Sequence, residues 1–168
     1  MHVPDCFPGD IVIGGRITRT QWERLVEAET WLASFDPVTK RDESGMIDFD
    51  EHLHLHDPDA AYGHFEALEA VLQGEGIPYD RNANAAYEYD GEEASFRPGM
   101  DGELVAPGSQ DGGGIMVEAE AVADYLARRL SLEEVLAEPE APNGLRLVCL
   151  RRDQPLPPFE FVEGDDVR

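Results

Sequence analysis

Polar and apolar residues alternate most regularly in the stretch Met46–Asp57 (MIDFDEHLHLHD). A period of two is the side-chain period of a β-strand, so the stretch predicts one amphipathic strand inside a sheet. One face is mainly apolar and needs helices to cover it, whereas the other is left to water or to a partner. The first face takes Ile47, Phe49, Glu51, Leu53 and Leu55, and the second takes Asp48, Asp50, His52, His54 and His56.

Helical periodicity lies on both sides of this stretch. Trp22, Leu25 and Leu32 recur at helical spacing behind capping threonines and predict a first helix over residues 20–34. A second helix is expected to start at Asp57-Pro58-Asp59, because aspartate caps helices, proline suits a first turn and acids favour the positive helix end. These two helices would cover the apolar face of the strand.

The remainder of the chain consists of short apolar runs separated by turn signals. Asp90-Gly91 is the strongest hairpin signal, and it predicts flanking strands over residues 85–89 and 92–97. Hairpins interrupt any strand–helix alternation, so we predict a single α+β domain, residues 1–168, with a mixed or mostly antiparallel sheet and helices packed on one face. Other expected elements are strands over 10–17, 102–106 and 145–150, helices over 117–130 and 131–137, and an extended, proline-rich and acidic C-terminal segment over 154–168.

Charge narrows the classes of partner. The chain has 36 acidic and 13 basic residues among 168, a formal net charge of −23, and 42% apolar residues, enough to build a core. This charge argues against direct contact with DNA, RNA or an anionic membrane, because phosphates would be repelled. A basic protein is the favoured partner.

Targeting and redox signals are few. Cys6 and Cys149 are too few and too far apart for a disulfide framework. The first residues lack a basic and apolar leader, and no apolar run approaches the roughly 18 residues of a membrane span. We therefore expect a cytoplasmic protein that does not enter a membrane.

The three histidines are the candidate metal site. Alternate residues along a strand are about 6.6 to 7 Å apart, so His52 and His54, or His54 and His56, can share one divalent ion, but all three cannot. A solvated polar face and a pH-responsive surface are the alternatives, since nearby aspartates favour protonated imidazoles. The third metal ligand would come from a neighbouring strand or from Asp48, Asp50 or His64.

The candidate partner-binding site consists of acidic residues in or beside the predicted strand Met46–Asp57 and the predicted hairpin. If these elements are neighbours, their carboxylates make one ridge that can imitate a phosphate backbone and occupy a basic nucleic-acid groove. The ridge would consist of Asp48, Asp50, Asp57, Asp59, Asp80, Glu88, Asp90, Glu92 and Glu93.

The leading hypothesis is therefore a non-enzymatic acidic binding protein, a decoy or inhibitor that covers a basic surface of a nucleic-acid-handling protein. DNA-mimicking counter-defence proteins of phages and plasmids, anti-CRISPR proteins and nuclease-toxin immunity proteins fit that description. An enzyme is less favoured, because the chain has no GxSxG, HExxH or P-loop motif. The alternatives are a metal-binding domain or metal-dependent enzyme that uses the histidines, and a salt-adapted domain whose acidity has no partner.

Overall fold

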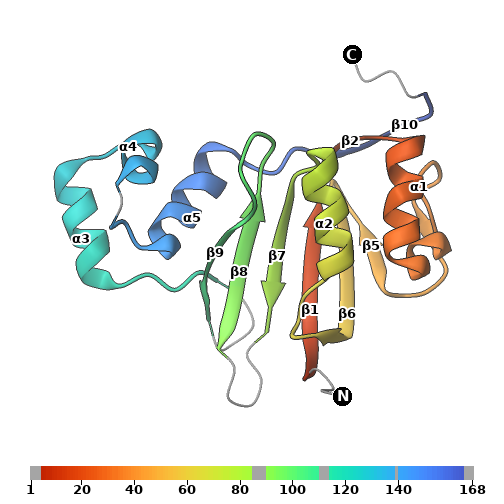
Figure 1. The fold of residues 1–168 in the computed structure, drawn as a ribbon, viewed down its shortest axis with the longest axis horizontal. Coiled ribbons are helices and arrows are strands. Elements are labelled where there is room, and N and C mark those ends of the chain that lie inside the picture. Colours follow the sequence, from red (N-terminus) through yellow and green to blue (C-terminus); the bar gives the residue numbers. More distant parts are fainter. Residues whose placement is uncertain (1–4, 85–89, 110–113, 139, 165–168) are drawn as a thin grey trace.

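One antiparallel sheet of six strands forms the centre of the molecule (Figure 1). The computed structural model describes residues 5–84, 90–109, 114–138 and 140–164. Together with the helices, this sheet confirms the predicted α+β class. In spatial order the strands are β5 (Ile47–Phe49), β6 (Leu53–Ala61), β1 (Cys6–Ile13), β7 (Tyr79–Ala83), β8 (Gly91–Phe96) and β9 (Leu104–Gly108).

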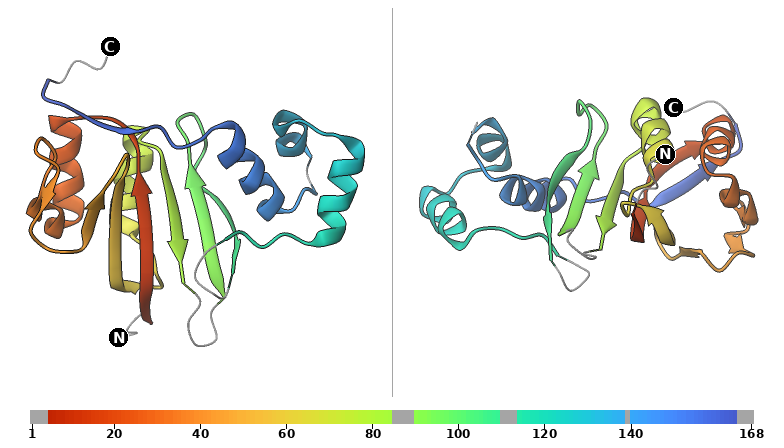
Figure 2. Two further views of the ribbon diagram at one scale, coloured as in Figure 1. Left: turned by 180° about the vertical axis from the view of Figure 1, so that it is seen from behind. Right: turned by 60° about the horizontal axis from the view of Figure 1, so that its bottom comes forward.

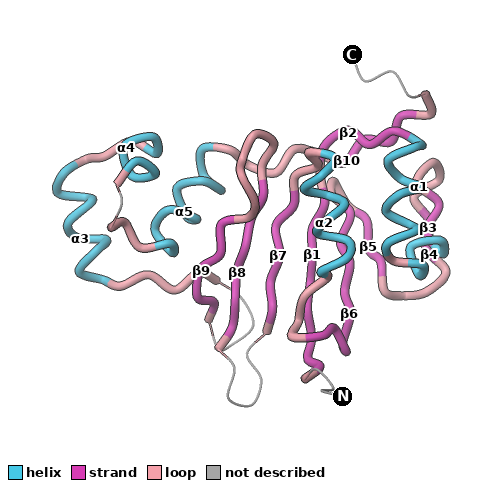
Figure 3. Tube along the Cα trace, viewed as in Figure 1, coloured by secondary structure: helices cyan, strands magenta, loops and turns pink. Residues whose placement is uncertain are grey.

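The stretch Met46–Asp57 does not form one strand, so that prediction was wrong. It folds into a β-hairpin in which β5 and β6 are joined by the turn 50–52 (Figure 3). Phe49 pairs with Leu53 across the turn, and Glu51 lies exposed in the turn instead of on the apolar face. A three-residue turn keeps the odd positions of both strands on one side of the sheet, so alternation alone does not reveal it.

The predicted first helix is divided into two. α1 (Arg19–Ala28) is an α-helix, and a 3-10 helix (Thr30–Ser34) follows it. Thr18 is the N-cap of α1, and its reciprocal capping partner is Gln21.

The second helix begins later than predicted. Asp57 and Pro58 lie inside β6, and α2 (Glu66–Glu75) starts eight residues after Pro58. Asp57 pairs with Gly9 of β1 directly beside an irregularity in the β1–β6 register. Proline is tolerated in a strand at such a bulge, so the Asp-Pro signal for a helix start was overridden by strand pairing.

The main core lies between the sheet and the helices α1 and α2. α2 lies against one face of the sheet, over β1 and β7, and packs beside α1 (Figures 1 and 2). The buried side chains of this core include Ile11, Ile13, Trp22, Leu25, Leu53, Leu55, Phe65, Leu68, Leu72, Tyr79 and Phe96.

Three helices lie beyond β9. They are α3 (Ala119–Arg128), α4 (Leu132–Ala137) and α5 (Asn143–Asp153). α5 occupies the residues 145–150 that were predicted to form a last strand, so that prediction was wrong. The run LRLVCL is apolar at five of six positions, so it fits a buried helix as well as a strand. Within the described residues, no helix is long and apolar enough to cross a membrane.

The predicted hairpin at Asp90-Gly91 is only partly described. β8 begins at Gly91 and pairs with β7, whereas the predicted partner strand 85–89 lies outside the described residues. β9 lies close to the predicted strand 102–106.

The C-terminal segment crosses the ends of the strands and joins the N-terminal half. The predicted strand 10–17 breaks at Gly14, and β2 (Gly15–Thr18) then pairs in parallel with β10 (Phe159–Val162). A Cβ at Gly14 would lie 2.0 Å from the Pro157 carbonyl oxygen, so this crossing requires glycine. A further two-stranded pair joins β3 (Phe35–Asp36) to β4 (Arg41–Asp42).

Candidate functional site

One side of β5, β6 and β1 carries acidic and histidine side chains. Asp48 lies opposite His54, which lies opposite Val12, and His56 lies opposite Asp10. Their strand neighbours Ile11, Leu53 and Leu55 are buried in the core, so the alternating side chains point the other way. Among the described residues, no helix covers this side of β5, β6 and β1 when the sheet is viewed from behind (Figure 2). We call the surface made by Asp10, Val12, Asp48, His54 and His56 the open face.

A shallow depression on the open face extends to Asp50 in the β5–β6 turn. Its lining, as far as the described residues show it, contains no lysine or arginine. Within it, Asp10 Oδ1 lies 2.7 Å from His56 Nδ1, and Asp50 Oδ1 lies 3.1 Å from His54 Nε2. These carboxylates therefore interact with histidines instead of permanently charged bases.

The carboxylate of Asp50 is held in place by the backbone of its own turn. Its Oδ1 accepts a hydrogen bond from the backbone N–H of His52 at 2.7 Å, an arrangement typical of an Asx turn. This bond and the neighbouring ring of His54 lower the pKa of Asp50 to about 2. Asp50 is consequently a carboxylate throughout the neutral range.

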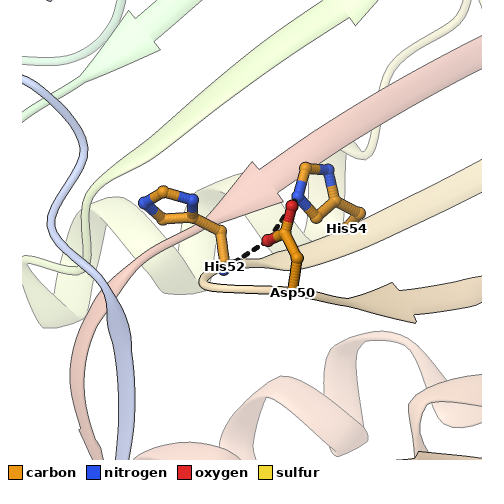
Figure 4. Close-up of side chains that lie close together, drawn as sticks. All are labelled: Asp50, His52 and His54. Carbon is orange, nitrogen blue, oxygen red and sulfur yellow. Dashed lines mark hydrogen bonds and ion pairs between the residues drawn. The ribbon is translucent and has the colours of Figure 1, made fainter.

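His52 is oriented by the C-terminal segment. Its Nε2 lies 2.9 Å from the carbonyl oxygen of Leu156, and Phe159 N donates to Glu51 O at 2.9 Å in the same junction. A carbonyl oxygen only accepts, so Nε2 carries the hydrogen and, in the neutral ring, Nδ1 is left with a lone pair. That nitrogen lies on the side of the ring that faces Asp50 and His54 (Figure 4).

Of the three histidines predicted to bind metal, the structure brings together two. His52 and His54 join Asp50 in a group whose three ligand atoms all lie within 4.8 Å of one another. It is the one such group found within the part of the chain that the structure describes. His56 interacts with Asp10 and does not belong to it, and His64 lies 3.0 Å from Glu92 on the other side of the sheet.

Glu92 does not belong to the open face but to a buried cluster around Arg81. The Arg81 side chain is 1% exposed, and it forms ion pairs with Glu69, Glu92 and Glu103. Hydrogen bonds from His64 and Arg81 outweigh burial and lower the pKa of Glu92 to about 2. Burial raises the pKa of Glu69, although Arg81 opposes this effect. Glu92 is therefore part of the internal structure.

Asp80 and Glu93 also form ion pairs with arginines. Arg97 Nη1 donates to Asp80 Oδ1 at 2.9 Å, and Arg151 Nη1 donates to Glu93 Oε2 at 2.9 Å. Arg151 comes from α5 and also donates to Ser95 Oγ at 2.8 Å. These contacts fasten α5 to β8, so the two carboxylates have a structural role.

The other predicted partner-binding residues are dispersed. Asp48 and Asp50 lie at the open face, whereas Asp57 lines a depression beside α2 on the helix-covered side, and Asp59 is exposed near the end of β6. Asp90 is exposed before β8, and Glu88 lies outside the described residues. β1 and β7 separate β6 from β8, so the described carboxylates do not form one continuous ridge.

Comparisons with known proteins do not add to this geometry. No family model, no curated protein and no solved structure matches the chain. The site must therefore be interpreted from its own residues. Its chemistry is that of a solvent-open group of carboxylates and imidazoles, which can bind cations, basic side chains or a metal ion.

Sequence reasoning missed Asp10 and the arginine partners. Asp10 alternates with Ile11 in a predicted strand, but its place beside His56 depends on the β1–β6 register, which no local pattern specifies. Arg81, Arg97 and Arg151 lie far along the chain from several of their acidic partners. The one available sequence signal for these ion pairs was the scarcity of bases among many acids, since a buried arginine needs an acidic partner.

Proposed function

We propose that the protein is a non-enzymatic acidic binding protein, and that its open face covers a basic surface of a nucleic-acid-handling protein. The observation that carries this proposal is the open face itself, where Asp10, Asp48 and the adjoining Asp50 lie in a depression whose described lining residues include no lysine or arginine. A cytoplasmic location, which the sequence predicts, belongs to the same proposal.

The charge distribution supports a basic partner. The net charge of −23 attracts cationic surfaces at long range and speeds their association, most strongly at low salt. The carboxylates of the open face project from a paired sheet, so little conformational entropy is lost when a partner orders them. A partner that normally binds nucleic acid presents the complementary surface of lysines and arginines.

The structure reduces the set of residues that the proposal uses. Asp80, Glu92 and Glu93 are engaged by arginines of the same chain, so charge reversal there would disturb folding and binding together. Asp10 and Asp48 offer a cleaner test, because their replacement by asparagine keeps the side-chain shape and removes two charges.

The test is a pull-down at low salt from a lysate of the organism that encodes the protein. The baits are the wild type, an Asp10→Asn/Asp48→Asn variant and a Glu23→Gln/Glu27→Gln variant, in which the same charge is removed from the exposed side of α1. Retained proteins are identified by mass spectrometry with and without competing duplex DNA.

We expect the wild type and the α1 variant to retain a nucleic-acid-binding protein that DNA displaces, and the open-face variant to retain at least about tenfold less, equivalent to roughly 1.4 kcal/mol. Retention of no such protein by the wild type contradicts the proposed function. Equal losses in both variants would assign the binding to total charge instead of to the open face.

A further inference from the structure

We propose that Asp50, His52 and His54 bind one divalent transition-metal ion, with Zn²⁺ as the best match, at the turn between β5 and β6. This inference goes beyond the proposed function, because it concerns a small-ion site and not a protein partner. Asp50 and His54 also line the depression on the open face, but metal titration tests the ion site separately from the pull-down. It rests on the mutual placement of the three side chains in Figure 4.

The three ligand atoms already lie near the spacing that a bound ion requires. Zn²⁺ bonds of about 2.0 to 2.1 Å in tetrahedral geometry put neighbouring ligand atoms roughly 3.3 Å apart. His54 Nε2 and Asp50 Oδ1 are 3.1 Å apart, and all three ligand atoms lie within 4.8 Å of one another. Small side-chain rotations are therefore enough to bring the third ligand into place.

Two of the ligands are held by hydrogen bonds of the kind found around metal sites. The His52 Nε2–H donates to the carbonyl oxygen of Leu156, which leaves Nδ1 for the metal and fixes the ring orientation. The backbone N–H of His52 fixes the carboxylate of Asp50. At His54 the metal takes the place of the Nε2 proton that is shared with Asp50, and the ring carries its proton on Nδ1.

The donor set determines the class of ion. Two imidazoles and one carboxylate suit Zn²⁺ and other late first-row metals, whereas Mg²⁺ and Ca²⁺ prefer oxygen ligands alone. The side chains of Asp50 and His54 are 69% and 40% exposed, so an ion can enter from solvent. Three protein ligands leave a position for water, as in open zinc sites.

Metal binding at this site also connects two distant parts of the chain. His52 contacts Leu156 through its other ring nitrogen, so an ion that holds His52 also stabilises the crossing of the C-terminal segment over the β5–β6 turn. An ion bound only by the folded state raises the unfolding temperature with increasing metal concentration.

The experiment is calorimetric titration of chelator-treated, full-length protein with ZnCl₂, in excess Mg²⁺ to occupy sites made of carboxylates alone. The variants are His54→Ala, which removes a ligand, and Asp50→Asn, which keeps an oxygen to accept the turn hydrogen bond. His56→Ala is the matched control, because it removes a histidine from the same strand and the same open face. The visible spectrum of the Co²⁺-loaded protein and the unfolding temperature are recorded for each.

We expect one Zn²⁺ per chain in the wild type and in His56→Ala. In His54→Ala and Asp50→Asn the affinity should fall at least about tenfold, since loss of even an outer-shell partner typically costs roughly 10- to 100-fold. A Co²⁺ spectrum with d–d bands and a metal-dependent rise in unfolding temperature should accompany binding only where all three ligands are present. Absence of Zn²⁺ binding in the folded wild type, or an equal loss in His56→Ala, would overturn the proposal.

Discussion

Asp80, Glu92 and Glu93 on strands β7 and β8 form ion pairs with arginines, whereas Asp10 and Asp50, at β1 and the β5–β6 turn, interact with histidines. Arg81 is the centre of the first group, and it is fully buried among Glu69, Glu92 and Glu103. In the second group Asp10 and Asp50 interact with His56 and His54 beside open solvent.

The difference separates structural acids, which stabilise the fold through arginines, from available acids, which a partner can bind. A buried carboxylate is tolerated only with a cation and hydrogen bonds. A partner that bound the acids around Arg81 would have to break their ion pairs and would destabilise the fold. Asp10 and Asp50 interact with histidines beside open solvent, so a partner can bind them at a smaller cost to the fold. Acidic residues that look equivalent in the sequence therefore have different functions in the structure.

The largest expected effect is that of Arg81→Met. The substitution leaves three carboxylates facing one another without their central cation, and we expect the free energy of unfolding to fall by about 3 to 5 kcal/mol. Urea denaturation measures it, with Arg81→Lys as the milder variant that keeps the charge but loses the planar fork. Arg16→Met is the control, because Arg16 and Glu160 form an exposed pair 3.4 Å apart whose loss costs about 1 kcal/mol or less. A loss in Arg81→Met no larger than in Arg16→Met would contradict the structural role of the cluster.

A smaller effect is expected in acid. The pKa of Glu92 is lowered to about 2 in the folded protein from an ordinary value of 4.5, so its contribution to stability is complete above pH 4.5 and is lost as the pH falls toward 2. Glu92→Gln lacks this contribution, and its stability should therefore fall less steeply over this interval. We expect a difference of roughly 1 to 2 kcal/mol, which allows for partial solvent screening of Glu92. Parallel curves of unfolding free energy against pH for the two proteins would count against the His64–Glu92–Arg81 contacts.

The smallest effect concerns salt. Screening of the net charge of −23 should raise the unfolding free energy by less than about 1 kcal/mol up to roughly 0.15 M KCl, where the Debye length is about 8 Å, and the curve should then level off. Asp10→Asn/Asp48→Asn should show a smaller rise, because it removes two acids from the acidic open face. Thermal unfolding across a KCl series checks this. A continued rise into molar KCl would favour the salt-adapted alternative.

Local sequence patterns predicted the class of the fold and failed where long-range pairing decided the outcome. The alternation in Met46–Asp57 correctly indicated buried positions such as Ile47, Leu53 and Leu55, but a three-residue turn leaves that pattern unchanged and remained hidden. Asp57-Pro58 resembled a helix start, yet the β1–β6 ladder and its bulge placed both residues in a strand. Capping boxes depend on neighbouring residues alone, and Ser131 with Glu134 accordingly caps α4, within the predicted helix 131–137.

The candidate site was predicted in its residue types but not in its grouping. His52 and His54 were identified as a possible pair, with Asp50 among several candidates for the third ligand. The turn that selects Asp50, and the Leu156 carbonyl that orients His52, both depend on tertiary structure. The division of the acids into two groups likewise depends on which strands adjoin in the sheet.

The most direct test compares two double variants that change the net charge equally. Asp10→Asn/Asp48→Asn removes two acids from the open face, and Glu92→Gln/Glu93→Gln removes two acids that contact arginines. The free energy of unfolding in urea at neutral pH should stay within about 0.5 kcal/mol of the wild type, or exceed it, in the first variant. In the second it should fall by about 2 to 4 kcal/mol. Equal losses in the two variants, or the greater loss in the open-face variant, would contradict the separation of structural and available acids.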